Sequence, residues 1–586
     1  MKHEIKISWL GLITGFVLLS CCFCYFCYIV PYHICLKEQI QLFVFSSSYF
    51  LSYFSKPAVF ACLAGDFLTQ FLCFKSGGAA VITLLLAMEW WLIFLILKRF
   101  SVKTRHATSL LPVFFEWLSL SNHIFSLALS VSIIISLMTF ITYIRNNGKI
   151  SVAAGIILIP ILYLLAGTSV FLFLILVVLY EIQCGRKRFI YWAVISVLAV
   201  AVPFIFRHYF LLTVKQAFLY PFPGIKVGLS LVVLALVVLL SVSFRKLTGF
   251  FSTDKFRNHK LIGAIIVLSS VFIVGLVKTT DLQQENLFGI TTEAYHNNWD
   301  KVLDIAEKAE IKNPVATQYI NIALSQKNLM GERLMDFYQP FTTGLLLPTL
   351  PSVNWFALFT ANDAYYHIGD MDMAQHAAMV GMISTPRQRS VRLTKRLAEI
   401  NLATGDLPAA TKYIRILEST LFHRMKTESV TAQPSTKIIS NSVQHDYSPQ
   451  RKGIFRKDII RRADDIKLSL ELLVEGDPDN LPAVNYLLCY YLLQKNIPSF
   501  FEAYTSYCKG KIYPVPKVYA EALLIYLAGT KSTMKEVNEY EIHPDIIKAF
   551  GEYTRLYEKN EGNLLPVQEK FPNSYWLFFH FAVMNN

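Results

Sequence analysis

The segment around which this chain is organised is residues 31–78, which read PYHICLKEQIQLFVFSSSYFLSYFSKPAVFACLAGDFLTQFLCFKSGG. Among the first 279 residues it is the only long segment that does not itself have the character of a membrane-spanning helix. It carries Glu38 and Asp66, two of only seven acidic residues in that part of the chain. Because ionisable groups near a membrane are costly and commonly functional, we expect any chemistry of this protein here.

Composition divides the 586 residues into two parts near residue 280. The first 279 residues hold 23 Lys and Arg against 7 Asp and Glu, whereas the remainder holds 32 against 34. The basic excess therefore belongs to the apolar part, where basic loops orient membrane helices. The high overall charge of +14 is thus a topology signal, and it gives no support to nucleic-acid binding. We expect a transmembrane domain at 1–279 and a second domain at 280–586.

Apolar runs predict nine membrane spans in the first domain, at residues 8–30, 79–97, 108–120, 123–144, 150–166, 168–183, 189–206, 226–244 and 261–279. With the N-terminus inside, four inner loops then hold 14 Lys and Arg, at residues 98–105, 145–149, 185–188 and 245–260. Omitting the short third span would place two of these basic loops outside, against the positive-inside bias. The sequence therefore predicts an inner-membrane protein with a cytoplasmic N-terminus and a periplasmic C-terminal domain.

The first outer segment predicts two helices lying in the membrane interface. Glu38, Gln41, Ser48 and Ser52 recur at near-helical spacing between aromatic residues, and residues 57–74 place phenylalanines on one face and polar residues on another. A plain linker is the alternative interpretation, although linkers are seldom so aromatic. Deeper in the spans, Glu89 and Glu116 are either functional acids or polar contacts that fix helix packing.

Residues 280–586 predict paired short helices. HIGDMDMAQHAAMVGMI (367–383) and ATGDLPAATKYIRILE (403–418) share a helix, a Gly-Asp turn and a second helix, with Gly369 and Gly405 36 residues apart. This period and these turns resemble tetratricopeptide repeats over most of 285–586. The resemblance implies an extracytoplasmic α-solenoid that binds a partner protein or a growing glycan. Residues 426–452, rich in Ser, Thr and Gln, predict a loop.

A basic cluster lies between the seventh and eighth predicted spans. Arg207, His208 and Lys215 could hold an anionic head group such as a phosphate of a membrane lipid, since Arg forms a bidentate fork and Lys acts as a point charge. The alternative is interfacial snorkelling beside aromatic anchors. No nucleotide-binding glycine loop, HExxH or GxSxG motif points to a soluble-type active site.

The layout of residues 1–279 resembles the GT-C class of polytopic glycosyltransferases, which use polyprenyl-phosphate sugars. The shared features are an inside N-terminus, a long first outer loop with an acid soon after the first helix, interfacial helices and an outer C-terminal domain. The resemblance implies that Glu38 or Asp66 serves as general base or holds a divalent metal, and that Arg207, His208, Lys215 and Gln41 bind substrate. The class often has paired acids in this loop, whereas this chain has one acid in KEQ and one far from it.

Two other functions remain open. A non-enzymatic scaffold would use the membrane domain as an anchor and the repeats to recruit partners. A polymerase or ligase of lipid-linked glycans would be favoured by a large, Arg-rich outer loop, and the outer segment 207–225 is small. The join of a polytopic core to a repeat domain also resembles uncharacterised bacterial envelope proteins.

Overall fold

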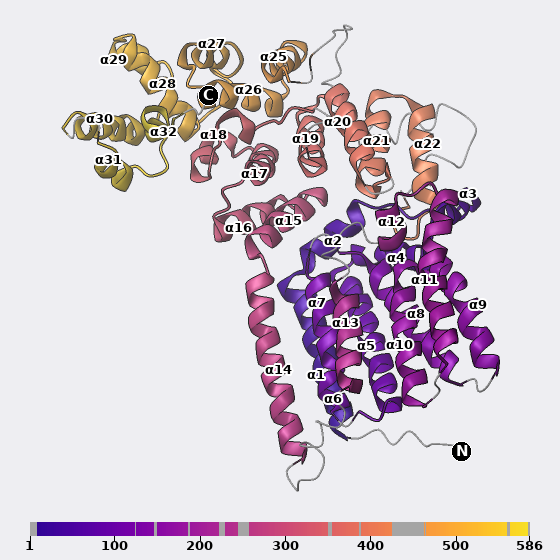
Figure 1. Ribbon diagram of the computed structural model, residues 1–586. Coiled ribbons are helices and arrows are strands. Elements are labelled where there is room, and N and C mark those ends of the chain that lie inside the picture. The colour runs from indigo at the N-terminus through magenta and orange to yellow at the C-terminus, as the bar shows by residue number, and fades with distance from the viewer. Residues whose placement is uncertain are drawn as a thin grey trace. The chain divides into compact units, whose positions relative to one another are not determined.

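The computed structural model describes residues 9–102, 104–122, 125–145, 149–185, 188–221, 229–243, 257–349, 354–385, 388–424, 462, 464–559 and 563–583. Within these residues all regular secondary structure is helical and no strand occurs (Figure 1). The predicted all-α fold class is confirmed. The loop predicted at 426–452 lies outside the described residues.

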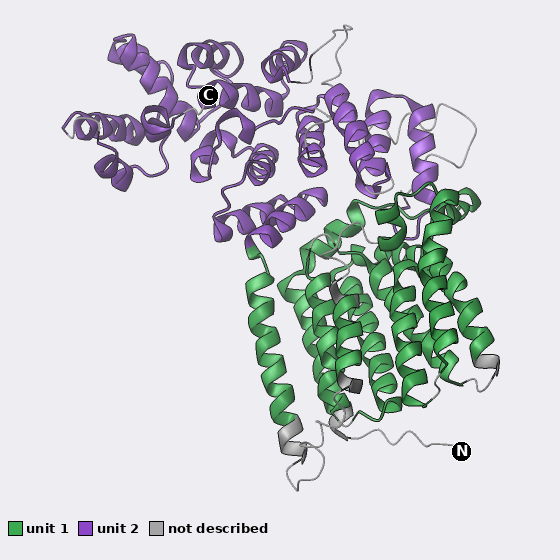
Figure 2. Ribbon diagram, viewed as in Figure 1, with its two compact units in different colours: residues 1–282 green, residues 283–586 purple. Residues whose placement is uncertain are grey.

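The chain divides into two compact units (Figure 2). Unit 1 comprises residues 1–282 and unit 2 comprises residues 283–586. Each unit has its own buried core, so each is described by itself.

Unit 1 is a bundle of apolar helices with short helices at one end. Its elements are α1 (Trp9–Cys24), η1 (Tyr25–Ile29), α2 (Pro31–Gln39), α3 (Ser47–Ser52), η2 (Tyr53–Ser55), α4 (Val59–Thr69), η3 (Gln70–Cys73), α5 (Lys75–Arg99), α6 (Arg105–Thr108), α7 (Leu110–Leu120), α8 (Leu127–Arg145), α9 (Lys149–Ala166), η4 (Gly167–Ser169), α10 (Val170–Gln183), α11 (Phe189–Tyr209), α12 (Val214–Leu219), α13 (Leu229–Ser243) and α14 (Arg257–Thr279).

Five described helical runs are long and apolar enough to cross a membrane: Lys75–Arg99, Leu127–Arg145, Val152–Gln183, Phe189–Tyr209 and Ile262–Thr279. A sixth is the pair Ile13–Ile29 and Pro31–Gln39, bent by 71°. These helices mark the chain as a membrane protein. A helix occurs at each of the nine predicted positions, but α7 and α13 are only 11 and 15 residues long, so the number nine stays a prediction.

The first outer segment is packed into the bundle. The sequence predicts two interfacial helices, whereas the structure has α2, α3 and α4, and seven of the nine residues of α2 are buried. Helix α4 packs against α8 and α9. At Gly65 an added Cβ would lie 2.5 Å from the backbone nitrogen of Ala128, so this close helix contact depends on glycine.

Unit 2 consists of short helices and 3₁₀ turns. Its elements are α15 (Leu282–Tyr295), α16 (Trp299–Ala309), α17 (Pro314–Gln326), α18 (Met330–Arg333), η6 (Leu334–Asp336), η7 (Phe341–Gly344), α19 (Trp355–Ile368), α20 (Met371–Ser384), α21 (Val391–Thr404), α22 (Leu407–Glu418), α25 (Ile466–Gly476), α26 (Leu481–Leu493), α27 (Ile497–Tyr507), α28 (Lys517–Gly529), α29 (Met534–Asn538), α30 (Pro544–Lys559), α31 (Leu564–Lys570) and α32 (Tyr575–Phe581).

The same turn recurs between paired helices of unit 2. A residue with positive φ ends the first helix, and the amide of the next residue donates to the carbonyl five positions back, as Asp370 does to Tyr365 at 2.9 Å. The positive-φ positions of this kind are Asn297, Asn328, Gly369, Lys495 and Lys531. Asp370 then caps the following helix by accepting from the amide of Met373. The Gly-Asp turn seen in the sequence is therefore a helix stop joined directly to a helix start.

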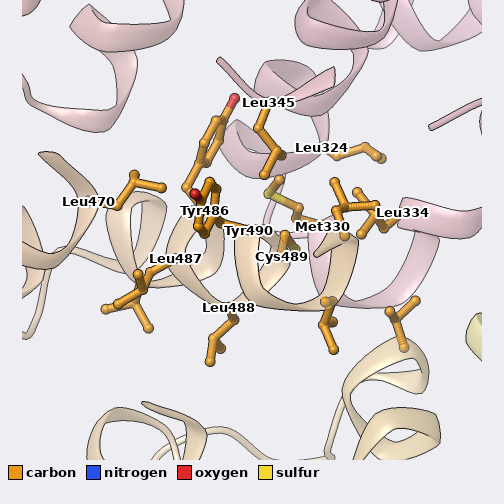
Figure 3. Close-up of a cluster of buried hydrophobic side chains, with 14 of the residues drawn as sticks. Leu324, Met330, Leu334, Leu345, Leu470, Tyr486, Leu487, Leu488, Cys489 and Tyr490 are labelled. Carbon is orange, nitrogen blue, oxygen red and sulfur yellow. The ribbon is translucent and has the colours of Figure 1, made fainter. Parts of the chain in front are cut away.

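Helices distant in the sequence share the core of unit 2. Helix α26 packs against α17 and α19, and α28 packs against α18. In this core Leu324, Met330 and Leu345 surround Tyr486 and Cys489 (Figure 3). The helix pairs are therefore not stacked only in chain order. The tetratricopeptide-like solenoid stays a prediction.

Candidate functional site

The structure places the six residues predicted for the site on the two segments of unit 1 that the sequence predicts to be outer. Glu38 lies on α2 and is buried, Gln41 follows that helix, and Asp66 lies half-buried on α4. The remaining three are on or after α11: half-buried Arg207, exposed His208, and exposed Lys215 on α12. Figure 1 shows α2, α3 and α12 at one end of unit 1 and α6 at the other. Both predicted outer segments therefore lie at the same end.

Asp66 is held by a tyrosine of the same segment. The hydroxyl of Tyr53 donates to Oδ2 of Asp66 at 2.7 Å. Tyr53 also lies 3.0 Å from the hydroxyl of Tyr49, which donates to the carbonyl of Leu42 at 3.1 Å. Both tyrosines are buried, so the carboxylate of Asp66 is oriented by a fixed donor.

Lys37 is the cation of this site. Its ammonium group, on α2, lies within electrostatic range of Asp66, and its Nζ is 5.4 Å from the centre of the Phe125 ring. Glu38, the next residue, is 100° further round the helix and interacts electrostatically with Cys73 of η3. We call Lys37, Tyr53 and Asp66 the Asp66 site.

An aromatic wall adjoins the Asp66 site. Phe67, the residue after Asp66, makes edge-to-face contacts with Phe43, Phe45 and Phe71 at centroid distances of 5.7–6.4 Å. Aromatic rings prefer this edge-to-face arrangement, which gives the segment a rigid apolar surface. Phe45 is 44% exposed, so the wall reaches the surface of the unit.

The basic residues predicted for the site on the second outer segment do not contact Glu38 or Asp66. Nε of Arg207 donates to Nε2 of His208 at 3.3 Å, and the guanidinium lies 4.3 Å from the ring centre of Phe204 on the same helix. Within the described part of the chain, no ion pair or hydrogen bond joins Arg207, His208 or Lys215 to Glu38 or Asp66. The structure thus brings Arg207 and His208 together but not with either carboxylate.

Lys56 joins the two outer segments instead. Its Nζ donates to the carbonyl of Phe210, just after α11, at 3.2 Å. Sequence reasoning missed Lys37, Tyr53 and Lys56. Lys37 directly precedes Glu38, and a lysine in so apolar a segment was a signal that could have singled it out.

The acids at membrane depth lie together in the bundle. Glu89 on α5 and Glu116 on α7 are both buried and interact electrostatically. The hydroxyl of Ser130, on α8, donates to Oε1 of Glu116 at 2.6 Å. The Ser130 hydrogen bond joins α8 to α7, as the packing alternative expects, whereas Glu89 and Glu116 repel each other when both are charged.

The Asp66 site does not fit a divalent metal. Among the residues that the structure describes, no three His, Cys, Asp or Glu side chains gather in one place. At Asp66 itself, the nearby Lys37 ammonium would repel a cation, and Tyr53 already donates to one carboxylate oxygen. We therefore derive no step through a metal.

The chemistry open to the Asp66 site is that of an oriented carboxylate beside an ammonium group. The carboxylate can accept a proton from a hydroxyl, and the ammonium can stabilise an anion such as a phosphate. No curated protein and no solved structure matches the chain. A family match covers residues 5–582, nearly the whole sequence. The chain belongs to the family of unknown function DUF6057.

Proposed function

We propose that this chain is a membrane glycosyltransferase that takes a sugar from a polyprenyl phosphate at the Asp66 site. The observation that carries the proposal is the hydrogen bond from Tyr53 to Asp66, with Lys37 within electrostatic range, inside the first outer segment. A linker would not need a buried tyrosine and a lysine around its acid. The acceptor would be a hydroxyl of an envelope glycan or glycoprotein.

In the proposed reaction an acceptor hydroxyl attacks the anomeric carbon of the sugar while the bond from that carbon to the phosphate oxygen breaks. Asp66 takes the hydroxyl proton, and Tyr53 holds the carboxylate in position. The polyprenyl phosphate leaves as an anion, whose charge Lys37 stabilises. The phosphate contact is thus assigned to Lys37 in place of Arg207, because among the described residues the Arg207 side chain contacts His208 and Phe204 of its own helix.

The other predicted residues receive roles around this centre. Glu38 and Gln41 follow Lys37 on and after α2 and would contact the sugar or the acceptor. Arg207, His208 and Lys215 would meet the lipid phosphate at the outer rim before it enters the site. This arrangement uses both outer segments, which Lys56 joins.

The proposal includes nine spans, a cytoplasmic N-terminus and a periplasmic unit 2 in the inner membrane. Helices α9 and α10, which form the run Val152–Gln183, pack against each other and against α8, which favours two spans over one. Gly167 lies between them with a φ of +70°, a conformation suited to a tight turn. The basic residues Lys98, Arg99 and Arg145 end α5 and α8, as inner ends require.

The test is sugar transfer by the full chain in lipid nanodiscs, with radiolabelled polyprenyl-phosphate hexose as donor and envelope glycan as acceptor. We expect D66N to lose at least 100-fold in turnover, as removal of a general base does. D304N is the matched control, because Asp304 is an exposed acid of unit 2 paired only with Lys308. Equal turnover by D66N and the unsubstituted chain would show that Asp66 is not the general base.

The second function that an observation favours is a membrane-anchored scaffold. Unit 2 repeats one helix-turn-helix form and carries surface hollows, as binding modules do. If the unsubstituted chain shows no transfer and D66N still supports envelope assembly in cells, the scaffold is the better description.

A further inference from the structure

Two neighbouring hollows lie at the C-terminal end of unit 2. The first, of about 320 Å³, is enclosed by α28, α30 and the residues around α32. The second, of about 280 Å³, lies between η6 and its following segment and α31 and α32. Pro572 and Ser574 line both hollows, so the two adjoin at these residues. We call the two together the Pro572 groove.

The first hollow offers a cation with spare hydrogen-bonding capacity. Nζ of Lys517 donates to the carbonyl of Asn573 at 3.2 Å, and no carboxylate among the described residues lies within ion-pair distance of it. Lys570, by contrast, is paired with Glu552 at 2.9 Å. An ammonium has three donors, so Lys517 can bind a further anionic group.

Glu521 lies beside Lys517 in the same hollow and is 2% exposed. Its Oε2 accepts from the amide of Tyr575 at 2.6 Å. Burial raises the pKa of Glu521 to about 7, against the lowering effect of that hydrogen bond. Near neutral pH this carboxyl group is therefore partly protonated and repels an incoming anion less than an ordinary glutamate would.

The second hollow is walled by apolar side chains. Phe337, Leu577 and Phe578 face it, and all three are only half-buried. Exposed amide side chains, Gln568 in the second hollow and Asn573 in the first, accompany them. Amide groups between an apolar wall and a cation match the hydrogen-bonding pattern of a peptide backbone.

We propose that the Pro572 groove binds a peptide segment of a partner protein, with an apolar side chain against Phe578 and a carboxylate on Lys517. The carboxylate can be a chain terminus or an acidic side chain. A free fatty acid would satisfy the wall and the lysine but would leave the amide of Gln568 unused; the amide of Asn573 already donates to Oδ1 of Asp336 at 3.4 Å. The site is separate from the Asp66 site and does not depend on transferase activity.

The test is calorimetric binding of three probes to the full chain in nanodiscs at pH 6.5. The probes are N-acetyl-Leu-Phe with a free carboxylate, the same dipeptide as its amide, and octanoate. We expect the dipeptide acid to bind at least tenfold more tightly than the amide and than octanoate. The K517M and F578A variants should each lose at least tenfold in affinity for it.

Two variants control for folding and for general charge. K517R keeps the cation and should bind within about threefold of the unsubstituted chain. K531M removes an exposed lysine just beyond α28, outside the groove, and should change nothing. Equal binding of acid and amide, equal or tighter binding of octanoate, unchanged binding by K517M, or no saturable binding of any probe would each overturn the proposal.

Discussion

The hydroxyl of Tyr53 donates a 2.7 Å hydrogen bond to Oδ2 of Asp66. The bond joins η2 to α4 and fixes an acid of the first outer segment that also has a lysine within electrostatic range. An acid held in this way is positioned before any substrate arrives, which is the condition for efficient proton transfer.

Removing the hydroxyl alone tests whether this positioning contributes. We expect Y53F to lower transfer by about 10-fold and to leave the KM for the lipid donor nearly unchanged, because Tyr53 would act on the base and not on the phosphate. The measurement is steady-state transfer in nanodiscs. Y28F is the control, since Tyr28 is 75% exposed on η1. An equal effect of both variants would contradict a positioning role for Tyr53.

Substitutions of Lys37 and Arg207 test which of these two cations contacts the phosphate. K37M should raise the KM for the lipid donor and lower turnover, together at least 100-fold in kcat/KM, because it removes charge stabilisation of the leaving phosphate. R207M should cost less than about fivefold, since Arg207 contacts His208 and Phe204 on its own helix. The reverse order of effects would return the phosphate to Arg207.

The close approach of α4 and α8 at Gly65 should contribute to the stability of the helix bundle. G65A should lower its stability by about 1–3 kcal/mol, because the new methyl group would lie 2.5 Å from the backbone nitrogen of Ala128 and 2.7 Å from its Cα. G263A on α14 is the matched control, since no atom lies within 4 Å of its added Cβ. Thermal unfolding in nanodiscs measures both. Equal melting temperatures would show that α4 can move away from α8.

Hydropathy predicts the membrane helices well but not their depth of packing. The long runs at α5, α8 and α11 follow from apolar composition alone, whereas the close approach of α4 to α8 is possible because Gly65 faces Ala128 without a side chain. That contact joins residues far apart in the chain, so no local pattern predicts it. The turns of unit 2 are different, because Gly369 and Asp370 encode a helix stop and a helix cap within two residues.

The sequence likewise predicts some residues of the candidate site and not others. Scarcity of acids in an apolar domain singles out Glu38 and Asp66 from the sequence alone. Which cation lies near these acids depends on which helices pack together. The sequence predicted Arg207 because basic residues cluster around it. Lys37 lies on α2, which is bent by 71° from the first helix, and comes within electrostatic range of Asp66 on α4; this approach of two separate helices is not encoded in composition.

A buried charge network ties together three helices of unit 2. Asp363 on α19 pairs with Arg392 and, at 2.9 Å, with Arg396, both on α21, and it accepts from the hydroxyl of Tyr319 on α17 at 3.0 Å. All four side chains are buried. D363N would leave the buried Arg392 without its carboxylate and would leave Arg396 with Glu399 alone, so we expect a loss of about 3–5 kcal/mol.

The measurement for D363N is the opening free energy of α19 and α21 by hydrogen exchange. The exposed pair of Asp304 and Lys308 supplies the control, because D304N should cost less than about 0.5 kcal/mol. Although burial alone would raise it, the two arginines lower the pKa of Asp363 to about 2. Its contribution should therefore be complete above pH 3.8 and be lost as the pH falls toward 2.

For Glu521 we expect the opposite pH dependence of folding stability, in the neutral range. Burial raises its pKa from 4.5 to about 7, with Glu332 and Asp336 adding to the rise and Lys517 and the Tyr575 amide opposing it. The folded chain therefore binds a proton that the unfolded chain has released between these pH values. The stability this group contributes is complete below pH 4.5 and is lost as the pH rises through 7, by on the order of 3 kcal/mol.

The E521Q variant isolates this contribution from every other pH-dependent contribution to stability. Glutamine keeps an oxygen for the Tyr575 amide but cannot ionise. Between pH 5 and 8 we expect the opening free energy of α28 and α32, corrected for intrinsic exchange rates, to fall more steeply in the unsubstituted chain than in E521Q. The difference between the two should grow with pH and level off above pH 7. A constant difference would mean that Glu521 is ionised throughout, held by Lys517, and that the Pro572 groove presents a negative charge beside its lysine.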